Sequence, residues 1–109
     1  MAFDEKLAER VRKVVSSNPG YSERKMFGGM SFIINGNMAV GVNEDKLIVR
    51  VGPDAYQEAL GKPYASAEDM TGRAINGWVT IAPAGLGDDQ ALQSWVAKGV
   101  KYASSLPPK

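Results

Sequence analysis

The dipeptide Asn35-Gly36 lies between two apolar segments, and it constrains the fold more than any other feature of the chain. Both residues tolerate the positive φ angles of a type I′ turn, so the pair predicts a two-residue β-hairpin. We expect four strands in this region, over residues 22–27, 30–34, 37–42 and 46–51. Because the connections are too short for a parallel crossover, the strands should form an antiparallel meander.

The segments that flank this meander have the patterns of helices. Residues 4–17 should form an amphipathic helix, because Phe3, Leu7, Val11, Val14 and Val15 recur at helical spacing and share one face. Further along, Pro53 suits the first turn of a second helix, and Gly61 is suited to end it.

The rest of the chain predicts one more strand and one more helix. Ser66 and Asp69 fit a capping box for a short helical turn, and residues 78–82 alternate as a strand does. Asp88 should cap the last helix, whose apolar stripe is Leu92, Trp95, Val96, Gly99 and Ala103. The order α-β-β-β-β-α-β-α predicts an α+β fold with helices packed on an antiparallel sheet. A chain of 109 residues supports one domain over residues 1–109.

The hairpin also predicts which side chains share a face of the sheet. Pairing Ile34 with Asn37 places Phe32 opposite Ala39 and Ser31 opposite Val40. If residues 43–45 form a three-residue turn, the core face carries Met30, Phe32, Ile34, Ala39, Gly41, Leu47, Val49 and Val51. The second face then carries Ser31, Ile33, Met38, Val40, Val42, Lys46, Ile48 and Arg50.

This second face is too apolar for a surface that water simply covers. One alternative is that a helix of the same chain packs on it. The other is that it is a protein contact, most simply a homodimer, because exposed apolar patches mark interaction sites.

The chain contains no cysteine and no histidine. Disulfides, thiolate nucleophiles, imidazole metal ligands and Ser-His-Asp catalysis are therefore excluded. We expect no catalytic, metal or cofactor site, and hence no enzyme. The chain has no apolar stretch of membrane-spanning length and no secretory pattern at its start, which favours a cytoplasmic location.

Several short motifs have simpler explanations than chemistry. Ser22 and Lys25 match the S-x-x-K pattern of serine acyl-enzymes, but on a strand their odd separation directs them to opposite faces. Gly28-Gly29 lacks the further residues of a phosphate-binding loop and suits a turn or bulge.

Two alternative functions use other groups of residues. Basic residues concentrate near the start of the chain and could contact nucleic acid; these are Arg10, Arg12, Lys13, Arg24 and Lys25. A net charge of +1 is low for a nucleic-acid-binding domain, so this alternative ranks below protein binding. A small-ligand pocket could be lined by Met26, Tyr56, Tyr64 and Trp78.

One extended motif resembles a known family. The residues Arg24-Lys25-Met26-Phe27-Gly28-Gly29, then Phe32 and Asn35-Gly36-Asn37-Met38, resemble the amino-terminal domain of the TfoX/Sxy competence-regulator family. Gly61-Lys62-Pro63, Pro83, Leu92 and Trp95 also fit, so the resemblance extends over essentially the whole chain.

The resemblance implies an α+β sandwich similar to type III secretion chaperones, whose members often dimerise. It also implies a bacterial regulator that promotes transcription of competence genes together with the cyclic-AMP receptor protein. Full-length members carry a second, helical domain that this sequence lacks, and the family offers no catalytic residues to transfer. We expect a cytoplasmic regulatory module that binds a protein partner or itself, with candidate contacts at Arg24, Lys25, Ile33, Met38, Val40, Ile48 and Arg50.

Overall fold

Helix α1 (Glu5–Val15) begins where the sequence provides a cap. The Asp4 carboxylate accepts hydrogen bonds from the backbone N–H groups of Lys6, at 2.9 Å, and Leu7, at 3.1 Å. These bonds satisfy amides that have no partner within the helix. The predicted apolar face is buried through Leu7, Val11 and Val15.

In this computed structural model, residues 3–26, 29–67 and 76–108 are described.

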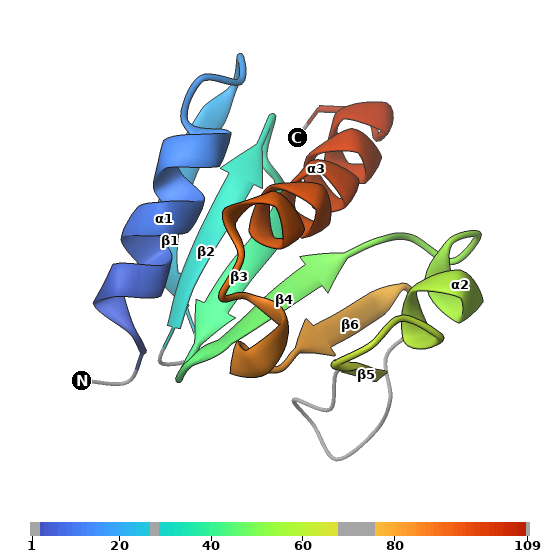
Figure 1. Cartoon of the computed structure of the whole chain (residues 1–109). Helices are drawn as coiled ribbons and strands as arrows, with labels where there is room; N and C mark the ends of the chain where they lie inside the picture. Colours follow the sequence, from blue (N-terminus) through green and yellow to red (C-terminus); the bar gives the residue numbers. More distant parts are fainter. Residues whose placement is uncertain (1–2, 27–28, 68–75, 109) are drawn as a thin grey trace.

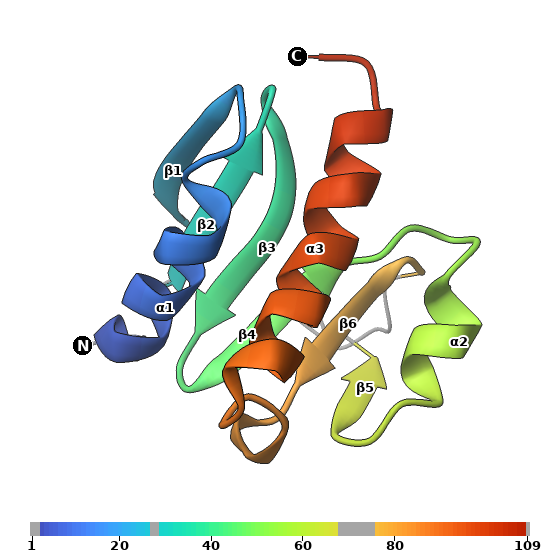
Figure 2. The same cartoon turned by 45° about the horizontal axis from the view of Figure 1, so that its top comes forward.

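Six strands of the described residues form one antiparallel sheet in the order β1-β2-β3-β4-β6-β5. Their bounds are β1 Tyr21–Met26, β2 Gly29–Ile34, β3 Asn37–Asn43, β4 Lys46–Arg50, β5 Ala65–Ala67 and β6 Trp78–Ile81. The helices that follow the meander are α2 Tyr56–Leu60, the 3₁₀ turn η1 Pro83–Gly85 and α3 Asp89–Ser105. Helices α1 and α3 lie side by side on one face of the sheet, and α2 lies beside β5 and β6 (Figures 1 and 2).

The predicted α+β fold and the order of its predicted elements are confirmed. One strand was not predicted: β5 pairs with β6 through Ser66 and Thr80. The capping box proposed at Ser66 is therefore wrong at that residue, which is extended, and Asp69 lies outside the described residues. Three small residues carry no alternating pattern, so this strand depends on its neighbour β6.

The hairpin register is confirmed at the turn and wrong beyond it. Ile34 pairs with Asn37 and Ile33 pairs with Met38, but a bulge then places Val40, not Ala39, opposite Phe32. Because one extra residue exchanges the two faces of a strand, Val40 and Val42 belong to the helix-covered face, where both are almost fully buried. Their predicted position on the second face is wrong.

A second register error compensates for the first. The predicted three-residue turn is shorter, because Asn43 pairs with Lys46 and Glu44 adopts a positive φ of 54°. Val40 therefore faces Val49, and Gly41 faces Ile48. The two one-residue shifts cancel in β4, so Leu47 and Val49 lie in the core as predicted.

Helix α3 presents its predicted stripe to the sheet, and its closest approach is at Gly99. A Cβ atom at Gly99 would lie 2.4 Å from the Ala39 carbonyl oxygen. Only a residue without a side chain allows the helix to pass so near β3.

No helix among the described residues is long and apolar enough to cross a bilayer.

Candidate functional site

Two of the five predicted basic residues form ion pairs within the chain. Arg10 pairs with Asp89 of α3 at 3.0 Å. Arg12 contacts both Glu23 carboxylate oxygens, at 2.8 and 2.9 Å, and Glu9 at 2.6 Å. These two guanidinium groups connect α1 to its neighbours and are not presented as free charges.

Arg12, Glu23 and Tyr21 form one hydrogen-bonded cluster. The Tyr21 hydroxyl donates to the Glu23 carboxylate. Hydrogen bonds from Arg12 hold the pKa of Glu23 below its ordinary value. Burial, followed by the bond to Glu23, raises the pKa of Tyr21 to about 12. Each shift favours the protonation state that joins α1 to β1, which indicates a structural role.

The other predicted basic residues do not converge. Glu23 lies opposite Phe32 of the core, so by strand alternation Lys25 lies on the helix side and Arg24 on the second face. Lys13 is exposed on α1. The fold therefore brings no compact patch of five cations together from these residues.

The second sheet face offers less apolar surface than the sequence predicts. Ile33 is 8% exposed and Ile48 is 5% exposed. Met38 is half-buried, and its side chain lies over Gly41. The Arg50 guanidinium lies over the Trp78 ring at 5.3 Å and the Tyr102 ring at 5.4 Å, so it makes cation–π contacts with its own chain.

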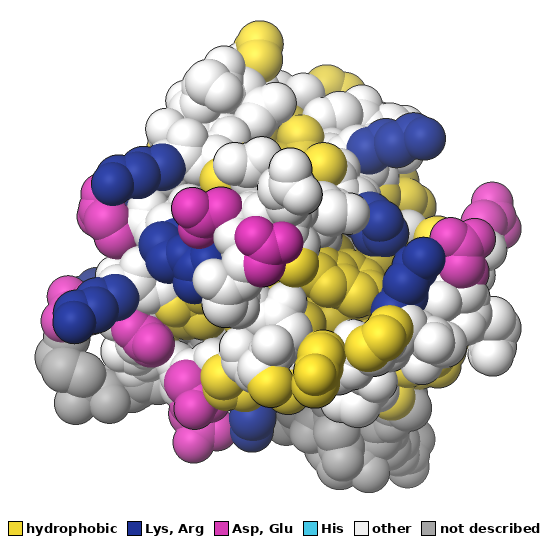
Figure 3. Space-filling view, in the orientation of Figure 1, with side chains coloured by type: hydrophobic (Ala, Val, Ile, Leu, Met, Phe, Trp, Pro, Cys, Tyr) yellow, Lys and Arg dark blue, Asp and Glu magenta, His cyan; other side chains and the backbone are white. Residues whose placement is uncertain are grey.

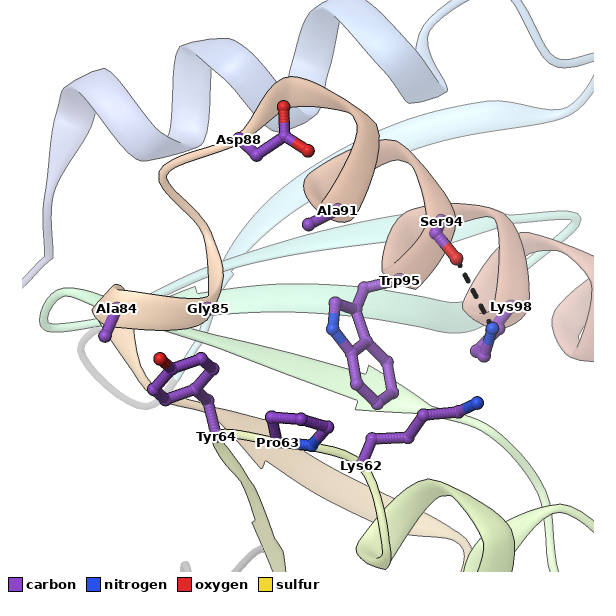
Figure 4. Close-up of a pocket in the computed structure, with 10 residues that line it drawn as sticks. All are labelled: Lys62, Pro63, Tyr64, Ala84, Gly85, Asp88, Ala91, Ser94, Trp95 and Lys98. Atoms are coloured by element: carbon purple, nitrogen blue, oxygen red, sulfur yellow. Dashed lines mark hydrogen bonds between the residues drawn. The ribbon is translucent and has the colours of Figure 1, made fainter.

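A different surface is hollowed: an open groove of about 380 Å³ lies between α3 and the segment that precedes β5. Its lining consists of Lys62, Pro63, Tyr64, Ala84, Gly85, Asp88, Ala91, Ser94, Trp95 and Lys98 (Figure 4). On the surface, hydrophobic side chains fill a hollow bordered by dark blue cationic side chains to the right of centre (Figure 3).

The Trp95 indole points from α3 toward Pro63, as Figure 4 shows. Trp95 is 7% exposed, because its other surfaces pack in the core. The Lys98 ammonium lies 5.6 Å from the centre of the indole ring and donates a long hydrogen bond of 3.4 Å to Ser94 Oγ. The groove therefore combines an aromatic surface with an adjacent amine.

Tyr64 forms the opposite side of the groove and is held in an unusual conformation. Its φ is 67°, which costs free energy for a bulky residue and marks positions under functional or structural constraint. Its carbonyl oxygen accepts a hydrogen bond of 2.9 Å from the Ala82 N–H, and Gly85 leaves room for its ring. Tyr64 is 57% exposed, and among the described residues no other large hydrophobic side chain is as open to solvent.

The two ends of the groove differ in charge. Lys62 and Lys98 lie at one end, and Asp88 lies toward the other (Figure 4). Asp88 stands at the N-cap position of α3, but its side chain makes no capping hydrogen bond, contrary to the prediction. A carboxylate that does not cap its own helix remains available to the groove.

The residues match the TfoX N-terminal domain family over positions 13–103. This chain belongs to that family. Membership confirms the resemblance found in the sequence and connects the domain, at family level, with regulatory, competence-related proteins. Comparison with curated proteins and with solved structures gave no significant match.

For this TfoX N-terminal domain, the groove was only partly predictable. Of the proposed pocket residues, Tyr64 does line it, whereas Tyr56 is buried in α2 and Trp78 pairs with Arg50. The Met26 side chain lies outside the described residues. The available signal was the Trp95–Lys98 pair one helical turn apart. Its proximity to residues 62–64 depends on tertiary structure.

The groove has the features of a recognition surface. Its titratable groups are the amines of Lys62 and Lys98, the phenol of Tyr64 and the carboxylate of Asp88. Within the described residues, no cluster of three or more acidic side chains could hold a metal ion. Apolar and aromatic walls with a few charged groups at the ends are typical of binding sites.

Proposed function

We propose that this domain is a cytoplasmic, non-enzymatic regulatory module that acts by binding a partner protein. The observation that carries the proposal is the groove between α3 and residues 62–64, where Trp95 and the exposed, conformationally constrained Tyr64 accompany two lysines. Tyrosine and tryptophan are enriched among the residues that contribute most to protein binding. Family membership supports a role in competence-related transcription.

The other proposals have less support. Self-association through the second sheet face is weakened because Val40 lies in the core, and because Ile33 and Ile48 are only slightly exposed. Direct nucleic-acid binding is weakened because Arg10 and Arg12 already form ion pairs within the chain. A small ligand would need an enclosed site that buries most of its surface, whereas this groove is open.

The proposal is tested by genetic complementation in the source organism. We expect deletion to lower transcription of the genes that the domain regulates, and wild-type protein to restore it. The double variant K62E/K98E should fail to restore transcription while accumulating to the same level as wild type. Lys101→Glu is the matched control, because Lys101 is an exposed lysine of α3 outside the groove lining.

Two outcomes contradict the proposal. If deletion changes no transcripts, the regulatory function is wrong. If K62E/K98E restores transcription as well as K101E does, the groove is not the surface through which regulation occurs.

A further inference from the structure

We infer that the groove binds an acidic peptide segment in a fixed direction, with one aliphatic or aromatic side chain against Trp95 and carboxylates beside Lys62 and Lys98. This inference rests on the proposed function and specifies the partner's chemistry. Three features of the groove favour this ligand: its size, the unequal charge of its ends and the constrained position of Tyr64.

The size of the groove favours an anchor side chain over a whole ligand. At about 380 Å³ it lies near the lower end of ligand pockets, which span about 300–1,000 Å³. The space is open along the surface, and Trp95 and Tyr64 lie at different points of its lining (Figure 4). An extended chain can therefore cross the opening and insert one apolar side chain, as peptide anchors do.

The charges determine the composition and the direction of the peptide. Lys62 comes from the segment before β5 and Lys98 from α3, so two ammonium groups approach one end from separate elements. Each ammonium has three donors, and Lys98 uses one in a weak bond to Ser94. Carboxylates are favoured at this end. Asp88 repels them at the other end, where a polar or basic residue of the peptide is favoured.

Tyr64 makes the site ready before binding. Its backbone carbonyl is bonded to the Ala82 N–H and part of its ring lies against Gly85, so the fold holds the residue beside the groove before a peptide binds. An aromatic side chain that is already placed and exposed adds binding surface at low entropic cost. This is a physical reason for a bulky residue to occupy a strained backbone position.

The experiment measures fluorescence anisotropy of labelled decapeptides added to the purified domain. The reference peptide has Glu residues on one side of a central Leu and Ser residues on the other. Three comparison peptides replace Glu with Lys, replace Leu with Ser, or reverse the sequence. We expect the reference to bind most tightly and its affinity to fall as salt rises, because the ion pairs are exposed.

Protein variants locate the site. K62E/K98E should weaken binding of the reference peptide about tenfold or more, since exposed ion pairs are lost and like charges introduced. K101E should bind as wild type, and circular dichroism should show equal folding of both. In proton–nitrogen NMR spectra, the Trp95 indole signal, assigned with Trp95→Phe, should shift on titration, whereas that of Trp78 should not.

The inference is overturned if the Lys-containing or reversed peptide binds equally well, or if none of the peptides shifts the Trp95 signal. ATP serves as a small anionic ligand for comparison. If ATP shifts the Trp95 indole signal and the peptides do not, the inference is also overturned. If the peptides do not bind but wild-type protein restores transcription and K62E/K98E does not, only the acidic peptide ligand is refuted. Peptide binding without any transcriptional effect would refute only the regulatory function.

Discussion

Glu23 decides how α1 is joined to the edge strand β1. Its carboxylate receives two hydrogen bonds from Arg12 and one from Tyr21. The sequence pattern shows five basic residues with Glu23 among them, which suggests a positive surface. The fold instead pairs Glu23 with Arg12, whose side chain reaches from α1 to β1.

This cluster predicts acid sensitivity. Because the pKa of folded Glu23 lies below its ordinary value of 4.5, the ion pair adds stability that is present above 4.5 and is lost as pH falls through the folded value. Glu23→Gln should lower the free energy of unfolding at neutral pH by about 1 kcal/mol or less, because the pair is partly exposed.

Urea denaturation at pH 7 and at lower pH measures the effect. The difference between wild type and Glu23→Gln should shrink as pH falls. Glu44→Gln is the control, since its carboxylate is highly exposed and lies 3.7 Å from Lys46. A difference that stays constant with pH would show that the ion pair does not contribute.

At the scale of elements, the bulge in β3 determines which residues form the surface. The alternation of the sequence is regular through Met38, and the extra residue Ala39 reverses it for the rest of the strand. Nothing in the local pattern marks the bulge. It places two valines, Val40 and Val42, beneath the helices, where they bury more apolar area than Ala39 and Gly41 would.

We expect Val40→Asp to abolish cooperative folding. Val40 is fully buried, and an unpaired carboxylate in the core costs several kcal/mol, a large part of the stability of a small domain. Met38→Asp, on the half-buried second face, should be tolerated far better. Thermal unfolding followed by circular dichroism distinguishes them, and a well-folded Val40→Asp protein would show that the register is wrong.

At the scale of the whole molecule, two side-chain hydrogen bonds join segments that lie far apart in the sequence. Arg10 and Asp89 are separated by 79 positions and join α1 to α3. The side-chain amide of Asn37 donates a hydrogen bond of 3.0 Å to the Pro107 carbonyl oxygen, which connects the segment after α3 to the start of β3. The position of α3 in turn places Trp95 and Lys98 beside residues 62–64, so the groove depends on how this helix lies on the sheet.

Gly99→Ala tests that packing. Alanine favours a helix by about 1 kcal/mol over glycine. At this position its Cβ would meet the Ala39 carbonyl at 2.4 Å, and overpacking typically costs about 1–3 kcal/mol, so we expect net destabilisation. Gly87→Ala is the control, because no atom lies within 4 Å of its added Cβ. Chemical denaturation compares the two, and equal stability would contradict close contact between α3 and β3.

The sequence by itself determined the elements whose causes are local: the Asn35-Gly36 turn, the alternating strands, the helical stripes and the order in which they follow. Turn geometry and helical periodicity act over a few residues, so they are legible in one chain. The family motif was equally legible.

Only the tertiary structure decided the bulge at Ala39, the short strand β5, the pairing of Arg10 and Arg12, and the groove around Trp95. Each of these depends on which distant segments come into contact. The free energy of those contacts comes from burial and charge pairing between distant segments, so a short stretch of sequence does not indicate them.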